Sequence, residues 1–93
     1  MATVYILYSS KTDNFYVGSC IDLESRLTEH NTGLYRLSFT SRANDWKVLL
    51  SVNNLGQYKA RKIEEHIKKM KSRKYIQNLI KYPEIIEKLI QRF

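Results

Sequence analysis

Two short runs of β-forming residues open the hydrophobic pattern of the chain, and a polar stretch separates them. The runs are residues 4–8 and 15–19, and the stretch between them is residues 9–14. Serine, aspartate and asparagine in this stretch are typical turn residues, so the pattern predicts a β-hairpin. The first run is mostly apolar rather than alternating, which indicates a central strand covered on both faces.

A helical segment follows the hairpin directly. Asp22 is a suitable N-cap for its first turn, and Gly33 stands where a helix commonly ends. Leu23 and Leu27 form an apolar stripe along one face. We expect this helix to pack on the sheet through that stripe.

The rest of the chain predicts one more strand and then helices. Residues 46–52 are rich in β-formers and form the third strand, which the polar residues Asn53 and Asn54 and then Gly56 should end. From Gln57 the apolar residues follow a helical period, and Pro83 suits the first turn of a final helix over residues 83–92. The apolar stripe between these points consists of Ala60, Ile63, Ile67, Met70, Ile76, Leu79 and Ile80. We therefore predict one α+β domain over residues 1–93, a three-stranded antiparallel sheet flanked by helices.

Four polar side chains in the first part of the chain indicate a role beyond folding. Each hairpin strand carries a tyrosine, Tyr5 or Tyr16, and the helix places Arg26 and His30 four residues apart on one face. If the hairpin packs on this helix, two phenols, a guanidinium and an imidazole converge. Alternatively, the tyrosines are ordinary sheet residues and His30 is a structural residue at the margin of the stripe.

The charge of the chain indicates a polyanionic partner. Sixteen basic against nine acidic residues give a net charge of +7, a balance typical of proteins that bind nucleic acid. Residues 57–82 contain nine basic residues and only two acids, so we interpret this segment as a phosphate-binding surface. Charge that merely keeps the protein in solution is the alternative.

Other classes of protein are disfavoured by composition. No run approaches the roughly 18 apolar residues of a membrane span, and the first residues do not resemble a signal peptide. We therefore expect a soluble, cytoplasmic protein that contacts no membrane. Cys20 is the only cysteine, which excludes an internal disulfide and disfavours a zinc cluster.

The same segments resemble the GIY-YIG nuclease family. The first signature is present as Val4-Tyr5-Ile6, with Thr3 in the usual place of glycine, and the second is present as Tyr16-Val17-Gly18. The family's helix motif matches Arg26, His30 and Asn31, and its later metal-binding glutamate matches Glu64. The resemblance covers roughly residues 2–80.

This resemblance implies a metal-dependent endonuclease that hydrolyses phosphodiester bonds in DNA, with RNA not excluded. Glu64 would hold one Mg²⁺ or Mn²⁺, and Arg26 would neutralise the scissile phosphate. The family favours Tyr5 as the general base and Tyr16 as the residue that positions water, although the sequence does not separate their roles. His30 would accept or relay the tyrosine proton.

Further residues are expected to contact the nucleic acid. Gly18 would let the substrate approach the strand. The hydroxyls and cation of residues 40–42 suit phosphate contacts, although this stretch also fits a plain surface connection. The full set comprises Gly18, Asn31, Thr40, Ser41, Arg42, Lys68, Lys69, Lys71 and Arg73.

Two other functions compete with the enzyme. A non-catalytic nucleic-acid-binding module would share the basic surface but would lose little without Tyr5 or Glu64. A protein-interaction adaptor would leave both the basic surface and the polar set unexplained. Many family members carry a separate recognition domain and this sequence shows none, so we expect it to act on structured DNA or to rely on a protein partner for specificity. The sequence leaves the oligomeric state open.

Overall fold

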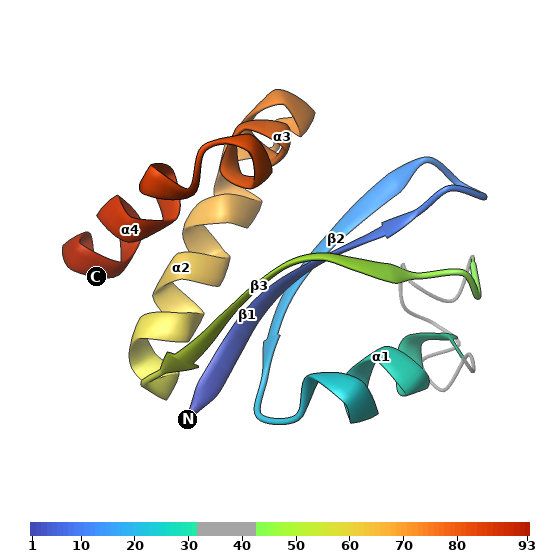
Figure 1. Cartoon of the computed structure of the whole chain (residues 1–93), viewed down its shortest axis with the longest axis horizontal. Helices are drawn as coiled ribbons and strands as arrows, with labels where there is room; N and C mark the ends of the chain where they lie inside the picture. Colours follow the sequence, from blue (N-terminus) through green and yellow to red (C-terminus); the bar gives the residue numbers. More distant parts are fainter. Residues whose placement is uncertain (32–42) are drawn as a thin grey trace.

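The computed structural model describes residues 1–31 and 43–93, which form three strands and four helices (Figure 1). The strands are β1 (Ala2–Ser9), β2 (Asn14–Cys20) and β3 (Lys47–Leu55), and the helices are α1 (Leu23–Asn31), α2 (Gln57–Met70), α3 (Arg73–Lys81) and α4 (Pro83–Arg92). The α+β prediction is confirmed. None of the helices in the described part of the chain is long and apolar enough to cross a membrane.

β1 is the central strand of the sheet, with β2 on one side and β3 on the other, and both pairings are antiparallel. β3 runs to Leu55, three residues beyond its predicted end, so the two asparagines do not end it. Ala2 pairs with Leu55 and Val4 with Val52, which leaves one extra residue on β3. Asn54 has a φ of 61°, a conformation that asparagine tolerates well, and the strand therefore continues through a bulge.

The sheet separates two hydrophobic cores, because successive side chains of a strand point to opposite faces. The larger core joins Val4 and Ile6 of β1 and Val17 of β2 to the apolar stripe of α2 and to α3 and α4. Figure 1 shows these three helices together on one side of the sheet. Ile63 and Ile67 of α2 are almost completely buried there.

The smaller core lies on the α1 side of the sheet. It contains Tyr5 and Leu7 of β1, together with Cys20 and Trp46, and Leu23 and Leu27 of α1 pack against it. Asp22 caps α1 as predicted, since its Oδ1 accepts a hydrogen bond from the Ser25 backbone N–H. His30 is the most deeply buried residue of α1, with 3% of its surface exposed. The histidine therefore points into the protein rather than lying at the margin of the stripe.

The basic segment is two helices rather than one continuous stripe. Lys71 has a left-handed conformation with a φ of 48°, which ends α2. Ser72 then caps α3, and its side chain accepts a hydrogen bond from the Tyr75 backbone N–H. Met70 was expected on the apolar stripe but is 45% exposed, because the chain leaves the helix immediately after it.

Candidate active site

Tyr5 lies directly over Gly18, its neighbour across the β1–β2 pairing. A Cβ atom at position 18 would come within 2.5 Å of the Tyr5 hydroxyl oxygen and 2.6 Å of Cζ, distances that are far shorter than normal contacts. The glycine therefore makes room for the Tyr5 ring. The space that a side chain of residue 18 would take is filled by the protein itself, and a contact between Gly18 and the substrate stays a prediction.

The Tyr5 hydroxyl reaches the buried imidazole of α1. Its oxygen lies 3.2 Å from Nε2 of His30. Burial, followed by the charges of nearby groups, raises the Tyr5 pKa far above its usual value, so the phenol is neutral at physiological pH. Burial, with a smaller contribution from Arg26, lowers the His30 pKa. A neutral imidazole has one nitrogen without a proton, so His30 can accept the hydrogen bond that Tyr5 donates.

Tyr16 completes an aromatic group with Tyr5 and His30. The centroid of its ring lies 5.0 Å from that of His30 and 6.3 Å from that of Tyr5. Trp46 packs edge-on against Tyr16, with 6.5 Å between the ring centroids. Tyr16 is half-buried whereas Tyr5 is buried, so Tyr16 presents the phenol that solvent reaches more easily.

Arg26 lies on the same side of the sheet as these rings. Its charge lowers the pKa values of both Tyr5 and His30, although burial dominates the shift at each group. The side chain is 39% exposed and forms a long ion pair of 3.8 Å with Glu29. The structure therefore places a partly exposed cation near the Tyr5–His30 pair.

Glu64 of α2 contacts β2, the outer strand beside this group. Its Oε1 accepts a hydrogen bond of 2.5 Å from the Ser19 hydroxyl, and its Oε2 lies 2.7 Å from Nζ of Lys68. The same ammonium lies 5.6 Å from the centre of the Tyr16 ring. Lys68 therefore links the carboxylate on one side of the sheet to the phenol on the other.

Glu64 offers a carboxylate, the kind of oxygen ligand that magnesium and manganese ions take. No group of three or more histidine, cysteine, aspartate or glutamate residues in the described part of the chain could hold a metal. Mg²⁺ is commonly held by one or two carboxylates, with water and substrate phosphate completing its shell. Glu64 could serve as such a single carboxylate, in competition with Lys68.

Asn31 is occupied by the protein itself. Its Nδ2 donates to the Trp46 carbonyl oxygen at 3.1 Å, and its Oδ1 accepts from the Trp46 N–H at 2.7 Å. Both ends of the amide therefore join the end of α1 to the start of β3. The structure gives Asn31 a bracing role, and its contact with nucleic acid stays a prediction.

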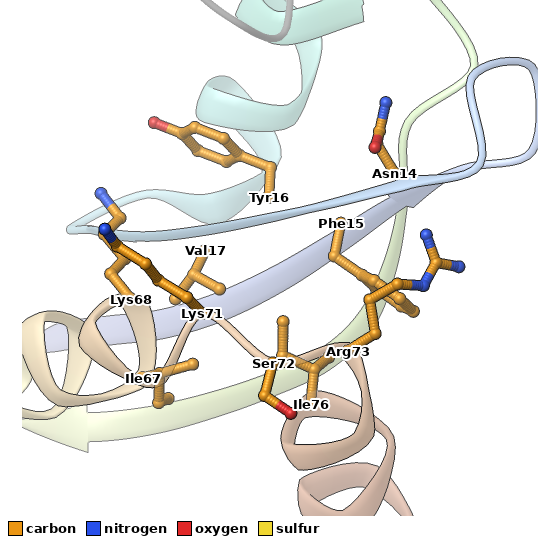
Figure 2. A pocket seen from close by; sticks show the side chains of 10 residues that line it. All are labelled: Asn14, Phe15, Tyr16, Val17, Ile67, Lys68, Lys71, Ser72, Arg73 and Ile76. Carbon is orange, nitrogen blue, oxygen red and sulfur yellow. The ribbon is translucent and has the colours of Figure 1, made fainter.

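The predicted basic contacts divide into two groups. Lys68, Lys71 and Arg73 line one pocket beside β2 (Figure 2), whereas Lys69 is exposed on α2 and does not line it. Residues 40–42 lie outside the part of the chain that the structure describes.

Sequence reasoning missed the parts that Ser19 and Trp46 play. Ser19 holds one oxygen of Glu64, and Trp46 supports the Tyr16 ring. Both contacts join residues that are distant in sequence. Period-two alternation could have placed Ser19 on the α2 side of its strand, but nothing in the pattern predicted the Trp46 contact.

Comparison with known proteins agrees with this geometry. The sequence model of the GIY-YIG catalytic domain matches residues 1–77. No curated protein and no solved structure gives a significant match. The chain therefore belongs to the GIY-YIG family, which is of a nuclease type and implies a nucleic-acid substrate. The matched residues include both signature strands, α1 and α2, and end within α3.

Proposed function

We propose that the protein is a metal-dependent endonuclease that hydrolyses phosphodiester bonds in DNA. The observation that carries this proposal is the buried contact between Tyr5 and His30, with Arg26 on the same side of the sheet. A fold that needed only a packed sheet would gain little from a buried hydroxyl–imidazole pair beside a cation.

Hydrolysis requires the removal of a proton from the attacking water. A free phenolate at Tyr5 is disfavoured, because burial raises its pKa. The hydrogen bond to His30 avoids this difficulty: Tyr5 can pass its own proton to Nε2 of His30 as its oxygen takes one from water. The lowered pKa of His30 keeps the imidazole neutral and able to accept that proton. Tyr16, which is more accessible, would position the water.

Negative charge on the phosphate also has to be stabilised. Arg26 presents a planar fork of donors that suits phosphate oxygens, and Lys68 adds a second cation at the edge of β2. A divalent ion held by Glu64 would supply positive charge at the phosphate and at the departing oxygen. Ser19 would orient the Glu64 carboxylate through the hydrogen bond already present.

One observation favours a second candidate function. Both oxygens of Glu64 already have partners within the protein, Ser19 and Lys68. A module that binds nucleic acid without cutting it could retain this ion pair as a structural feature. The two functions differ in whether Lys68 leaves Glu64 when a divalent ion is offered.

The test is an incubation of the purified protein with labelled DNA, comprising duplex, nicked, flapped and branched forms. Each form is tested with Mg²⁺, with Mn²⁺ and with EDTA. We expect cleavage of at least one form with either metal and none with EDTA. Binding without cleavage under all conditions would favour the non-catalytic module, and cleavage in EDTA would contradict the role of the metal.

A further inference from the structure

A pocket of about 420 Å³ opens beside β2, an outer strand of the sheet, next to the candidate active site. Its apolar lining comes from the strand and the facing helices, namely Phe15, Val17, Ile67 and Ile76. Three cations, Lys68, Lys71 and Arg73, also line it. Figure 2 shows Tyr16 and Val17 on opposite sides of β2, so the strand edge separates this pocket from the Tyr5–His30 side.

The Lys68 side chain connects the pocket to the candidate site. Tyr16 and Lys68 both line the pocket. Lys68 also forms the ion pair with Glu64 and lies over the Tyr16 ring. Because Lys68 both pairs with Glu64 and lines the pocket, a phosphate bound beside Glu64 would lie close to this opening.

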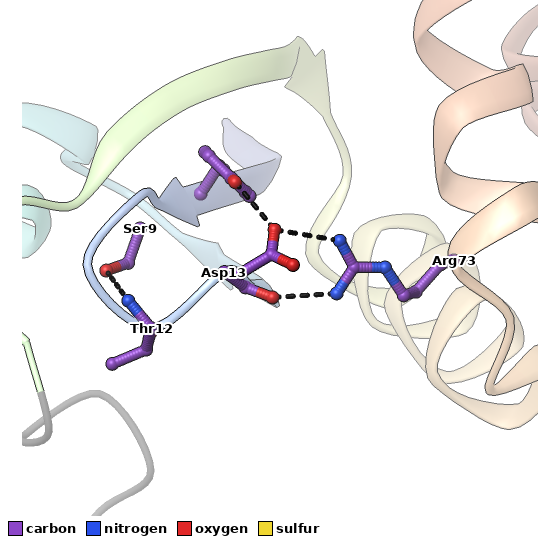
Figure 3. Close-up of polar contacts among 5 residues, drawn as sticks. Ser9, Thr12, Asp13 and Arg73 are labelled. Atoms are coloured by element: carbon purple, nitrogen blue, oxygen red, sulfur yellow. Dashed lines mark hydrogen bonds and ion pairs between the residues drawn. The ribbon is translucent and has the colours of Figure 1, made fainter.

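The cation at the far end of the pocket is held in place by the protein. Arg73 donates to the Asp13 backbone carbonyl oxygen at 2.7 Å and to its Oδ1 at 3.0 Å (Figure 3). The Tyr8 hydroxyl donates to the same carboxylate at 2.7 Å. The guanidinium carbon also lies 5.1 Å from the centre of the Phe15 ring. Because these contacts fix Arg73, it can present a guanidinium plane to a ligand with little loss of side-chain entropy.

We propose that this pocket binds one unpaired nucleobase of the DNA substrate, adjacent to the phosphate that is cut. An apolar pocket with cations beside it matches a nucleotide, whose flat base avoids water and whose phosphate is anionic. A base inside a duplex is stacked on both faces and cannot enter, so the nucleotide has to be unpaired or extruded. This inference rests on the proposed function and adds the substrate class to it: DNA with an unpaired nucleotide at the cleavage site.

The test measures binding rather than cleavage, so that the two proposals can fail separately. The probe is a duplex with a one-nucleotide flap that carries 2-aminopurine, and its partner has an abasic residue on the same backbone. Binding is measured to the Glu64→Gln protein, which we expect not to cut. We expect the base-bearing flap to bind roughly tenfold more tightly than the abasic flap, as stacking and burial of one base would give. Acrylamide should quench the bound 2-aminopurine several-fold less than the free DNA.

Two variants locate the effect. Ile76→Trp fills the pocket from α3 and should bring the affinity ratio close to one, whereas Ile80→Trp adds the same ring at an exposed position of the same helix and should leave the ratio unchanged. If Ile76→Trp fails to fold, the quenching measurement on Glu64→Gln decides alone. Equal affinity for the two flaps, full quenching in the complex, or the same loss in both tryptophan variants would overturn the proposal. Cleavage of other DNA forms could still proceed in that case.

Discussion

The hydroxyl oxygen of Tyr5 lies 3.2 Å from Nε2 of His30, although 25 residues separate them in sequence. Gly18 is the reason that the Tyr5 ring can occupy this position, since any side chain there would displace it. The glycine of the second signature is therefore needed so that the tyrosine of the first can reach His30. This relationship leads to two predictions about stability.

The first prediction concerns the size of residue 18. Gly18→Ser places a Cβ inside the contact distance of the buried Tyr5 ring, and overpacking of this kind costs about 1–3 kcal/mol of unfolding free energy. Gly56→Ser is the control, because a Cβ there meets nothing within 4 Å and the residue precedes α2 in an extended conformation. Denaturant unfolding should separate the two variants. Equal stability of both would show that Tyr5 can move away at no cost.

The second prediction concerns pH. Burial lowers the pKa of His30 in the folded protein below its unfolded value of ~6.5. The unfolded chain therefore binds a proton at His30 more readily than the folded protein does. The neutral His30 imidazole stabilises the folded protein fully above pH ~6.5, and this stabilisation is lost as the pH falls below that value. The melting temperature should fall between pH 7 and pH 5, and His30→Gln should reduce that fall. His66→Gln, at the other histidine of the chain, serves as the control; an identical pH profile for His30→Gln and the unaltered protein would contradict the prediction.

A third prediction tests the bracing role of Asn31. Asn31→Ala removes both side-chain hydrogen bonds to the Trp46 backbone, which lie in a partly buried place. We expect a loss of about 1–3 kcal/mol in unfolding free energy. Asn44→Ala is the control. Asn44 is exposed, and its amide oxygen accepts a hydrogen bond from the Lys11 ammonium. If the Asn31 variant keeps its stability but binds DNA poorly, the amide contacts nucleic acid after all.

A fourth prediction concerns the basic residues beside β2. Each phosphate that a lysine neutralises contributes about −0.9 to the slope of log affinity against log salt. Lys71→Asn removes one such charge while keeping a residue type that tolerates the left-handed conformation at position 71. The slope should become less negative by roughly that amount. Lys88→Asn makes the same charge change on α4 and should leave the slope unaltered; the opposite ranking would move the nucleic-acid surface to α4.

Much of the fold follows from local patterns in the sequence. The hairpin, the Asp22 cap and the helix beginning at Pro83 each depend on neighbouring residues, and all three are present in the structure. The break between α2 and α3 was not predicted. Lys71 is not a residue type that marks a left-handed turn, so only the serine after it offered a signal.

The candidate site could likewise be predicted only in part. Spacing along β1, β2 and α1 was enough to predict that Tyr5, Tyr16 and His30 would lie together, as their ring distances show. The partners of Gly18 and Asn31 were not predicted, because the first depends on the exact register of the hairpin strands and the second on how the end of α1 meets the start of β3. Sequence spacing identified residues that the fold brings together, but it did not predict the contacts that each residue makes.

The central claim is that Glu64 binds the divalent ion required for cleavage, and one pair of variants tests it most directly. Glu64→Gln keeps the size and polarity of the side chain but removes its charge, whereas Glu65→Gln makes the same change at the next residue, which is exposed and paired only loosely with Lys62 at 4.0 Å. The cleavage rate of labelled DNA in Mg²⁺ is measured for both, with binding measured in parallel. Glu64→Gln should bind DNA at least as tightly as the unaltered protein and cut it ~10²-fold or more slowly, while Glu65→Gln should cut normally. Unchanged cleavage by Glu64→Gln would contradict the account.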